Sequence, residues 1–133
     1  MTGKDTDFLN PRNGSCLGHL FLFHKKRNLG DETEYTAQDF ENFEDMETFL
    51  RETEEAIVVL PVFGYDHGQL RIQVGPYNDH WDSGQLGFIW ATKGDILTWY
   101  QAPEWEDRLA SEASAVLLSE VEAYDAYINN EYE

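Results

Sequence analysis

The sequence has few basic residues: its 133 residues include only nine Lys and Arg against 26 Asp and Glu, which gives a net charge of −17. Nucleic acid and anionic lipid are both bound through basic patches, so this deficit argues against direct binding to either. The complementary partner of such a chain is a basic protein surface, for example the nucleic-acid groove of another protein.

Cysteine and long apolar runs are also scarce. The single Cys16 excludes an intramolecular disulfide and a four-cysteine zinc site, and it suits a reducing compartment. The longest apolar run, 56–63, is far shorter than a membrane span, and residues 1–11 lack the apolar segment of a signal peptide. We therefore expect a cytoplasmic protein.

Hydrophobic residues, in contrast, make up 41% of the chain, and aromatic residues make up 14%. A chain of this length and composition can bury a core without disulfide or metal support, and it fits one domain. We predict a single domain over 1–133, in which residues 1–15 are a candidate flexible N-terminal arm.

The negative charge lies in two blocks of the sequence. Residues 1–30 carry a net charge of +3 and residues 56–100 a net charge of −2, whereas 31–55 carry −10 and 101–133 carry −8. Two segments therefore hold nearly all of the excess, and each of them contains a single Arg.

The near-neutral part of the chain predicts a sheet. Residues 56–63 are a β-branched apolar run, and residues 70–74 alternate apolar and polar side chains, which together predict a hairpin. Residues 86–91 predict a third strand, and residues 17–24 predict a further one. Within the first run, Pro61 lacks an amide donor, so it marks an edge, a bulge or the end of the strand.

The two acidic blocks predict helices. In residues 36–52 the apolar side chains recur every three to four positions, and Thr36 with Asp39 resembles a helix start. The same pattern runs over 103–128, and residues 93–100 fit a short additional helix. We therefore predict an α+β fold, in which a small, mostly antiparallel sheet of three to four strands is packed by two amphipathic acidic helices.

The carboxylates of both long helices are expected to form exposed rows, because the apolar stripes face the sheet. Only Arg51 and Arg108 are near enough in sequence to pair with them. Carboxylates at helical spacing can imitate the phosphates of a nucleic acid. The predicted partner-binding acids are Glu41, Glu44, Asp45 and Glu47 on the first helix and Glu112, Glu120, Glu122 and Asp125 on the last.

The acidic excess also has simpler explanations. Runs of charge are usually solvated faces that serve solubility. An organism adapted to high salt carries the same excess throughout its proteins. Composition alone does not separate these explanations from a functional acidic surface.

Three motifs resemble a known group of proteins. They are Leu-Pro-Val-Phe-Gly-Tyr-Asp-His at 60–67, Trp-Asp-Ser-Gly-Gln-Leu-Gly-Phe-Ile at 81–89, and Glu-Val-Glu-Ala-Tyr-Asp-Ala-Tyr at 120–127. Over 55–128 the chain resembles a family of small proteins carried by phages, plasmids and conjugative elements, mostly without an assigned activity. Gly68 directly follows the histidine, where the family has Ser-Gly, and the first third of the chain does not match. The resemblance implies a mobile-element accessory protein and supplies no catalytic residues.

The two central motifs have two chemical interpretations. Their Asp and His side chains are of types that bind zinc or manganese, although no spacing among them is diagnostic of a site. The same motifs make good turns, because Asp bonds nearby backbone amides and Gly accepts a positive φ. We expect turns, with no metal ion, no cofactor and no catalytic residue. The motif residues with a structural or binding role are Asp66, His67, Trp81, Asp82 and Ser83.

These observations favour a non-enzymatic binding protein. We expect a mobile-element inhibitor of a host defence nuclease complex, of the anti-CRISPR or antirestriction kind. It would act as a DNA mimic whose acidic surface occupies a basic groove. An immunity or antitoxin protein for a basic toxin is the alternative of the same class. A metal-dependent protein or enzyme built on the loops at 66–67 and 79–82, and an accessory protein of a high-salt host, also stay open.

Overall fold

The structure is a computed structural model, and it describes residues 10–66, 68–77 and 83–130. Four strands form one antiparallel sheet in the spatial order β1-β4-β2-β3, and helices surround it. This is the predicted α+β fold with a small antiparallel sheet. The elements in chain order are η1 (Pro11–Asn13), β1 (His19–Leu22), η2 (Ala37–Asp39), α2 (Phe43–Glu52), β2 (Ala56–Asp66), β3 (Leu70–Val74), β4 (Ser83–Thr92), α3 (Lys93–Tyr100) and α4 (Arg108–Asn130).

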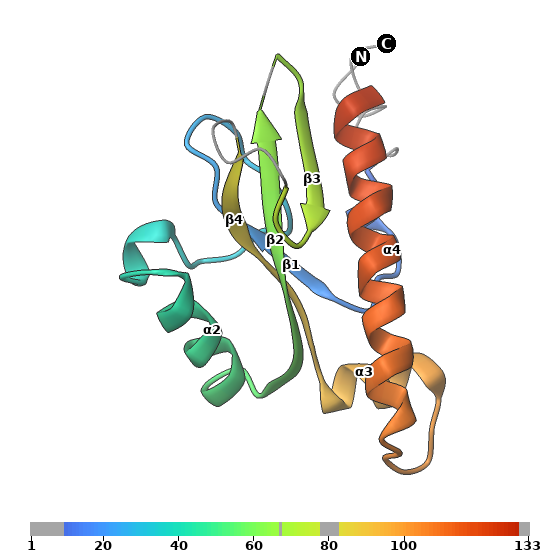
Figure 1. The fold of residues 1–133 in the computed structure, drawn as a ribbon. Coiled ribbons are helices and arrows are strands. Elements are labelled where there is room, and N and C mark those ends of the chain that lie inside the picture. The colour runs from blue at the N-terminus through green and yellow to red at the C-terminus, as the bar shows by residue number, and fades with distance from the viewer. Residues whose placement is uncertain (1–9, 67, 78–82, 131–133) are drawn as a thin grey trace.

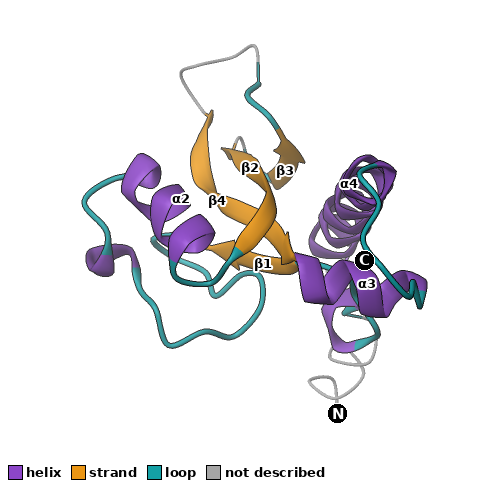
Figure 2. Ribbon diagram, turned by 90° about the horizontal axis from the view of Figure 1, so that it is seen from below, coloured by secondary structure: helices purple, strands orange, loops and turns teal. Residues whose placement is uncertain are grey.

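The sheet is the middle layer of three. Helix α2 covers one of its faces, and α4 with α3 lies on the opposite face, as Figures 1 and 2 show. Each face has its own hydrophobic core: the one below α4 is the larger, and the one below α2 is mainly aromatic. The predicted helices therefore pack on the sheet, but they pack on opposite sides of it.

Alternating side chains along the central strand β4 supply both cores. Phe88 and Trp90 belong to the core below α2, whereas Ile89 and Ala91 belong to the core below α4. Burial of each large apolar side chain contributes roughly 1.5–3 kcal/mol. The apolar run 86–91 therefore encodes a strand that is buried on both faces.

The predicted hairpin is confirmed, since β2 and β3 pair antiparallel from Val62 opposite Val74 to Asp66 opposite Leu70. Beyond Val62, toward Ala56, β2 keeps only β4 as a partner. Pro61 lies at this boundary, next to a register shift between Val62 and Phe63. Its carbonyl accepts the amide of Gly75 at 3.0 Å. Pro61, which has no backbone N–H to donate, therefore lies where the pairing with β3 ends.

The first long helix begins later than predicted. Thr36 and Asp39 do form a capping box, but it closes only the 3-10 turn η2, and Phe40 then returns to an extended conformation. The side chain of Asn42 accepts the amide of Asp45 at 2.7 Å and starts α2 at Phe43. The spacing of apolar residues in 36–52 continued through a turn that does not belong to the helix.

The last helix also begins later, at Arg108 instead of residue 103. Trp105 still packs against the core below α4, but it does so from the loop that follows α3. The short helix at 93–100 is confirmed as α3, and Thr92 and Asp95 form its capping box. Among the helices of the described ranges, none is both long and apolar enough to cross a membrane.

Gly87 provides a test of this sheet. It lies in β4 opposite Leu22 on one side and Val62 on the other, and an added Cβ would overlap the carbonyl oxygen of Phe21. We expect Gly87→Ala to lower the free energy of unfolding by at least about 2 kcal/mol, because backbone must shift. Urea denaturation measures this loss.

The control is Gly84→Ala in the same strand, where a new Cβ meets nothing within 4 Å. This variant should stay within about 0.5 kcal/mol of the parent. Equal stability of the two variants would contradict the pairing of β1 with β4.

Candidate functional site

The acids of α2 are exposed to solvent. Glu41, Glu44 and Asp45 are exposed, whereas Glu47 is half-buried and pairs with Arg51 at 3.0 Å. The segments that precede and follow α2 in the chain add further exposed carboxylates. We define the α2-side acidic surface as the eight exposed acids of this part of the chain: Glu32, Glu34, Asp39, Glu41, Glu44, Asp45, Glu52 and Glu55.

On α4 the structure differs from the prediction. Glu122 is exposed, and Glu112 is exposed but pairs with Arg108 at 2.7 Å. Glu120 and Asp125 do not face solvent: Glu120 is half-buried, and Asp125 is only 9% exposed. The expectation that both belong to a solvent-facing row is wrong, because Glu120 accepts two buried backbone amides, Asp125 accepts one, and each of them binds an arginine.

Glu120 closes a polar cluster around Arg12. Its carboxylate accepts the amides of Leu17 and Gly18 at 2.7 and 3.0 Å and lies 3.2 Å from the guanidinium of Arg12. The side chain of Arg12 is only 4% exposed, and it also pairs with Asp31 at 2.9 Å. Burial alone would lower the pKa of Arg12, but its bonds to Asp31 and Glu120 outweigh this and raise it. The guanidinium therefore stays charged.

The cluster around Arg12 includes part of the segment that was predicted to be a flexible N-terminal arm. Residues 10–15 carry η1, and Arg12 within it ties this segment to the start of β1 and to α4. Residues 1–9 of the predicted arm lie outside the described residues.

Asp125 joins α4 to β3 in a similar way. It accepts the amide of Ile72 at 2.8 Å and binds the guanidinium of Arg71 at 2.8 Å. Its hydrogen bond and charge raise the pKa of Arg71. Burial, followed by the charge of Asp125, raises the pKa of the nearby Tyr77 to about 12. Asp125 is thus a docking contact of α4 on the sheet.

The two acidic helices do not form one surface. The sheet separates α2 from α4 (Figure 1), so the exposed acids of one helix face away from those of the other. A partner that binds one flat patch reaches only one of these sets. The α2 side is the stronger candidate because eight of its acids are exposed, whereas Glu120 and Asp125 of α4 are engaged in contacts inside the molecule.

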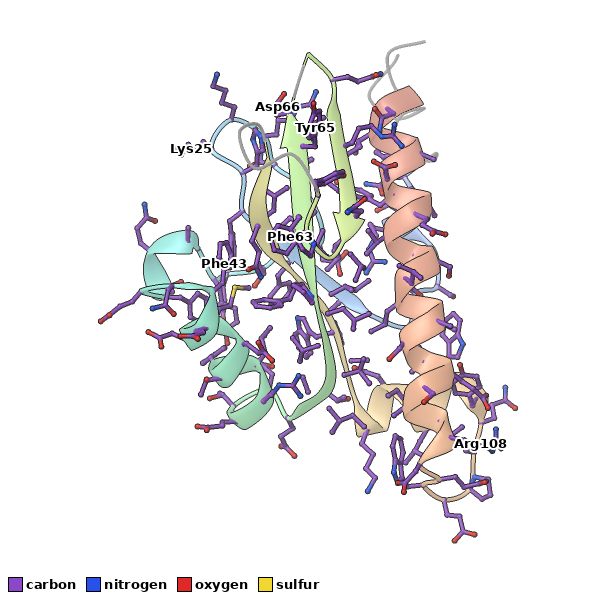
Figure 3. All side chains as sticks on the ribbon, in the orientation of Figure 1. Lys25, Phe43, Phe63, Tyr65, Asp66 and Arg108 are labelled. Carbon is purple, nitrogen blue, oxygen red and sulfur yellow. The ribbon has the colours of Figure 1, made fainter. Side chains whose placement is uncertain are left out.

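The central motifs converge at one end of the sheet. Tyr65 pairs with Ser83, so the strand ends that carry the two motifs lie side by side. Figure 3 shows Tyr65 and Asp66 at this end, near Lys25. His67, Trp81 and Asp82 lie outside the described residues, as does the side chain of Ser83.

A pocket of about 480 Å³ lies at this end, and the described parts of both motifs line it. Asp66 contributes from β2, and Gly84 and Gln85 contribute from β4. His24 of the loop after β1 approaches the carboxylate of Asp66 at 3.7 Å. Among the described residues, no group of three or more His, Cys, Asp and Glu side chains has the geometry of a metal site.

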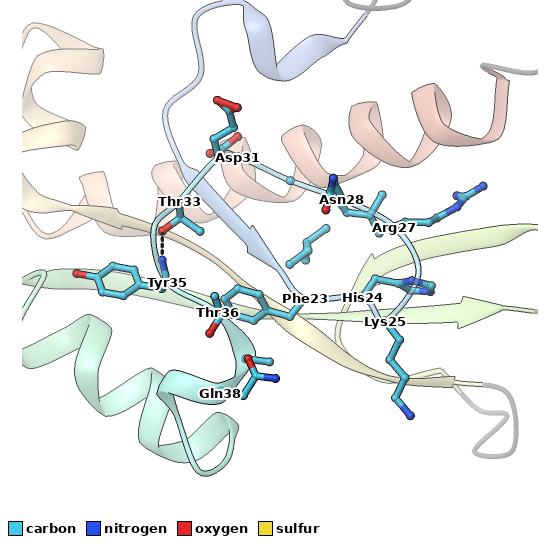
Figure 4. Close-up of a pocket in the computed structure, with 15 residues that line it drawn as sticks. Phe23, His24, Lys25, Arg27, Asn28, Asp31, Thr33, Tyr35, Thr36 and Gln38 are labelled. Carbon is cyan, nitrogen blue, oxygen red and sulfur yellow. Dashed lines mark hydrogen bonds between the residues drawn. The ribbon is translucent and has the colours of Figure 1, made fainter.

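A second cavity, of about 880 Å³, lies under the loop that joins β1 to η2 (Figure 4). Basic side chains of Lys25 and Arg27 and acidic side chains of Asp31 and Glu32 line it together. Tyr35 also lines it, and its amide donates to the hydroxyl of Thr33 at 3.2 Å. The mixed charge of this lining selects no ligand by itself.

A third pocket, which the sequence reasoning missed, lies within the α2-side acidic surface. The rings of Tyr35, Phe40 and Phe49 line it together with the carboxylates of Glu34 and Asp39. The available signal was the set of aromatic residues inside the most acidic block of the sequence. The helical pattern assigned Phe40 to a buried stripe and concealed this arrangement.

Comparison with protein-family models, with curated proteins and with solved structures finds no match to this chain. The resemblance to mobile-element accessory proteins therefore stays a prediction.

The Arg12 cluster gives a second test. We expect Glu120→Gln to lower the free energy of unfolding by about 2–4 kcal/mol, because a neutral amide compensates Arg12 and the two buried amides poorly. Glu122→Gln, an exposed neighbour on the same helix, should change it by less than about 0.5 kcal/mol. Chemical denaturation of both variants makes the comparison. If the two variants were equally stable, the contact between α4 and the N-terminal segment would be absent in solution.

Proposed function

We propose that this protein is a non-enzymatic binding protein that uses its α2-side acidic surface to occupy a basic groove of a nucleic-acid-binding protein. In this proposal it is a mobile-element inhibitor of a host defence nuclease complex, and it acts in the cytoplasm of the host cell. The observation that carries the proposal is the set of eight exposed carboxylates in α2 and the segments that flank it.

The charges of this surface are largely uncompensated. The only basic residue of the 31–55 block is Arg51, and it is already paired with Glu47. Ordinary solvated helices intersperse the two signs, since opposite charges at i,i+4 add stability and like charges subtract it. Keeping an excess of one sign has a cost in self-repulsion, and a basic partner removes that cost on binding.

The spacing of these acids suits a polyanion-binding groove. Helix neighbours three to four residues apart lie about 5–6 Å from one another, and the phosphates of a nucleic-acid strand also repeat every few ångströms. Glu44 and Asp45 lie in the first turn of α2 and Glu52 lies at its last residue, whereas Glu41, which was predicted to be on this helix, precedes the cap residue Asn42. Complementary potentials of this kind steer encounter and fix orientation more than they add affinity.

The surface proposed to bind the partner excludes the acids of α4 that the sequence predicted to take part. Glu120 and Asp125 are engaged in contacts inside the molecule, and α4 faces the other way. The imitation of nucleic acid is therefore assigned to one helix and its flanking turns.

Paired charge reversals test the proposal. The bead-bound full chain is used to capture binding proteins from host lysate, and a captured protein is then assayed for binding to a labelled DNA duplex. Glu41→Lys with Glu44→Lys should weaken capture and DNA displacement about 10-fold or more, because each reversal replaces an attraction by a repulsion. Binding should also fall as salt is raised.

The matched control is Glu104→Lys with Glu122→Lys, which changes the net charge equally on the α4 side, where both acids are exposed. This pair should bind nearly as tightly as the parent chain. If both double variants lost binding equally, the net charge of the chain, and not the position of its acids, would determine binding. A captured protein that binds no nucleic acid would contradict the inhibitor role and favour the immunity-protein alternative.

A further inference from the structure

Three aromatic rings form an open pocket within the α2-side acidic surface. The ring centroids of Tyr35, Phe40 and Phe49 lie 5.1–6.2 Å apart, and their planes are tilted by 53–74° to one another. All three side chains are only partly buried, so ring surface reaches solvent. The volume of the pocket is about 500 Å³. We call it the aromatic pocket.

Local structure fixes the positions of these rings. Phe49 projects from α2, and Phe40 follows the capping box of η2, whose extended end turns it toward the helix. The hydroxyl of Tyr35 donates to Glu54 at 3.0 Å and is thereby held at the rim. That hydrogen bond, with some burial, raises the pKa of Tyr35, so the phenol stays neutral and its hydroxyl keeps donating.

Carboxylates line the same pocket. Glu34 and Asp39 both line it and are exposed, and Asp39 is oriented by the amide of Thr36 at 2.7 Å. No described basic residue lines the pocket. Four of the five arginines in the chain are paired with carboxylates elsewhere: Arg12, Arg51, Arg71 and Arg108.

This combination of groups is suited to a cation. The face of an aromatic ring carries negative potential and attracts a cation within about 6 Å of the centroid. A guanidinium group is flat, stacks on rings and donates two parallel hydrogen bonds to a carboxylate, whereas an ammonium group is compact and more strongly hydrated. Rings with nearby carboxylates therefore match an arginine better than a lysine.

We infer that the aromatic pocket binds an arginine side chain of the partner protein and acts as the anchor of the α2-side acidic surface. This inference rests on the proposed function, because it names the group by which the basic partner is held. Arginine and aromatic residues dominate the binding energy of many interfaces, while surrounding charges contribute little each.

Packing alone also explains why these rings are present, since they extend the core below α2. The test must therefore weaken the electrostatics of a ring without changing its shape. Replacing Phe49 by its mono-, di- and trifluorinated analogues does this, because fluorine withdraws the negative charge from the ring face. The probe is a fluorescently labelled octapeptide of alternating Arg and Gly, and its Kd for the full chain is measured by anisotropy.

We expect Kd to rise stepwise with the number of fluorines, by about 3- to 10-fold at three fluorines, with an unchanged melting temperature. The same series at Phe43 is the control, because Phe43 is half-buried on α2 and packs against Phe88, outside the pocket. That series should leave Kd unchanged. A peptide of alternating Lys and Gly should bind more weakly and respond less to fluorination.

The outcomes separate the two proposals. If the Arg peptide fails to bind the parent chain in low salt, both proposals fail. If the peptide binds and the Glu41→Lys and Glu44→Lys pair weakens it, but fluorination at Phe49 does not, the acidic surface stands and the aromatic pocket is overturned. If Lys and Arg peptides respond alike, the assignment to arginine is overturned. A variant Phe40→Leu provides a second ring to test, and it should also raise Kd.

Discussion

The alternation of side chains along β4 sets the arrangement of the whole molecule. Because successive residues point to opposite faces, Phe88 and Trp90 require a cover on one side, and Ile89 and Ala91 require one on the other. One helix cannot supply both covers. Helix α2 packs on the first face and α4 on the second, so the two acidic segments of the sequence are forced to opposite sides of the sheet.

This separation gives the two acidic segments different roles. The acids of α4 that lie nearest its apolar stripe are used inside the molecule, where Glu120 and Asp125 bind arginines and backbone amides. Eight of the acids around α2 remain on the surface, and the one Arg of the 31–55 block, Arg51, is paired with Glu47. A single compositional feature, the acidic excess, thus divides into a structural part and a part that is open to a partner.

Much of the fold could be predicted from the sequence because the strands follow simple patterns. β3 was predicted with its observed bounds, and the hairpin with β2 followed from two adjacent apolar patterns. The starts of α2 and α4 were missed because side chains decide them: the cap at Asn42 overrides a regular apolar spacing that extends back to Thr36. Periodicity finds a helix more easily than it finds where the helix begins.

The site was predicted less well than the fold, for a physical reason. Whether an acid is exposed depends on partners that are distant in the chain, as with Glu120 and the amides of Leu17 and Gly18. A helical wheel places Glu120 off the apolar stripe of α4. It does not reveal that Glu120 lies at the border of this stripe, next to the buried Val121. The aromatic pocket was missed for a similar reason, since Tyr35, Phe40 and Phe49 come from three successive local structures.

The position of Pro61 has a consequence for how copies of this protein meet. Within residues 10–66, 68–77 and 83–130, the half of β2 nearest Ala56 has no neighbouring strand on the side that β3 leaves open, and such edges allow other strands to add. A proline at the boundary offers no amide to an incoming strand, and the strong negative charge keeps identical chains apart. Pro61 therefore limits how far another strand could extend its pairing along this edge of the sheet.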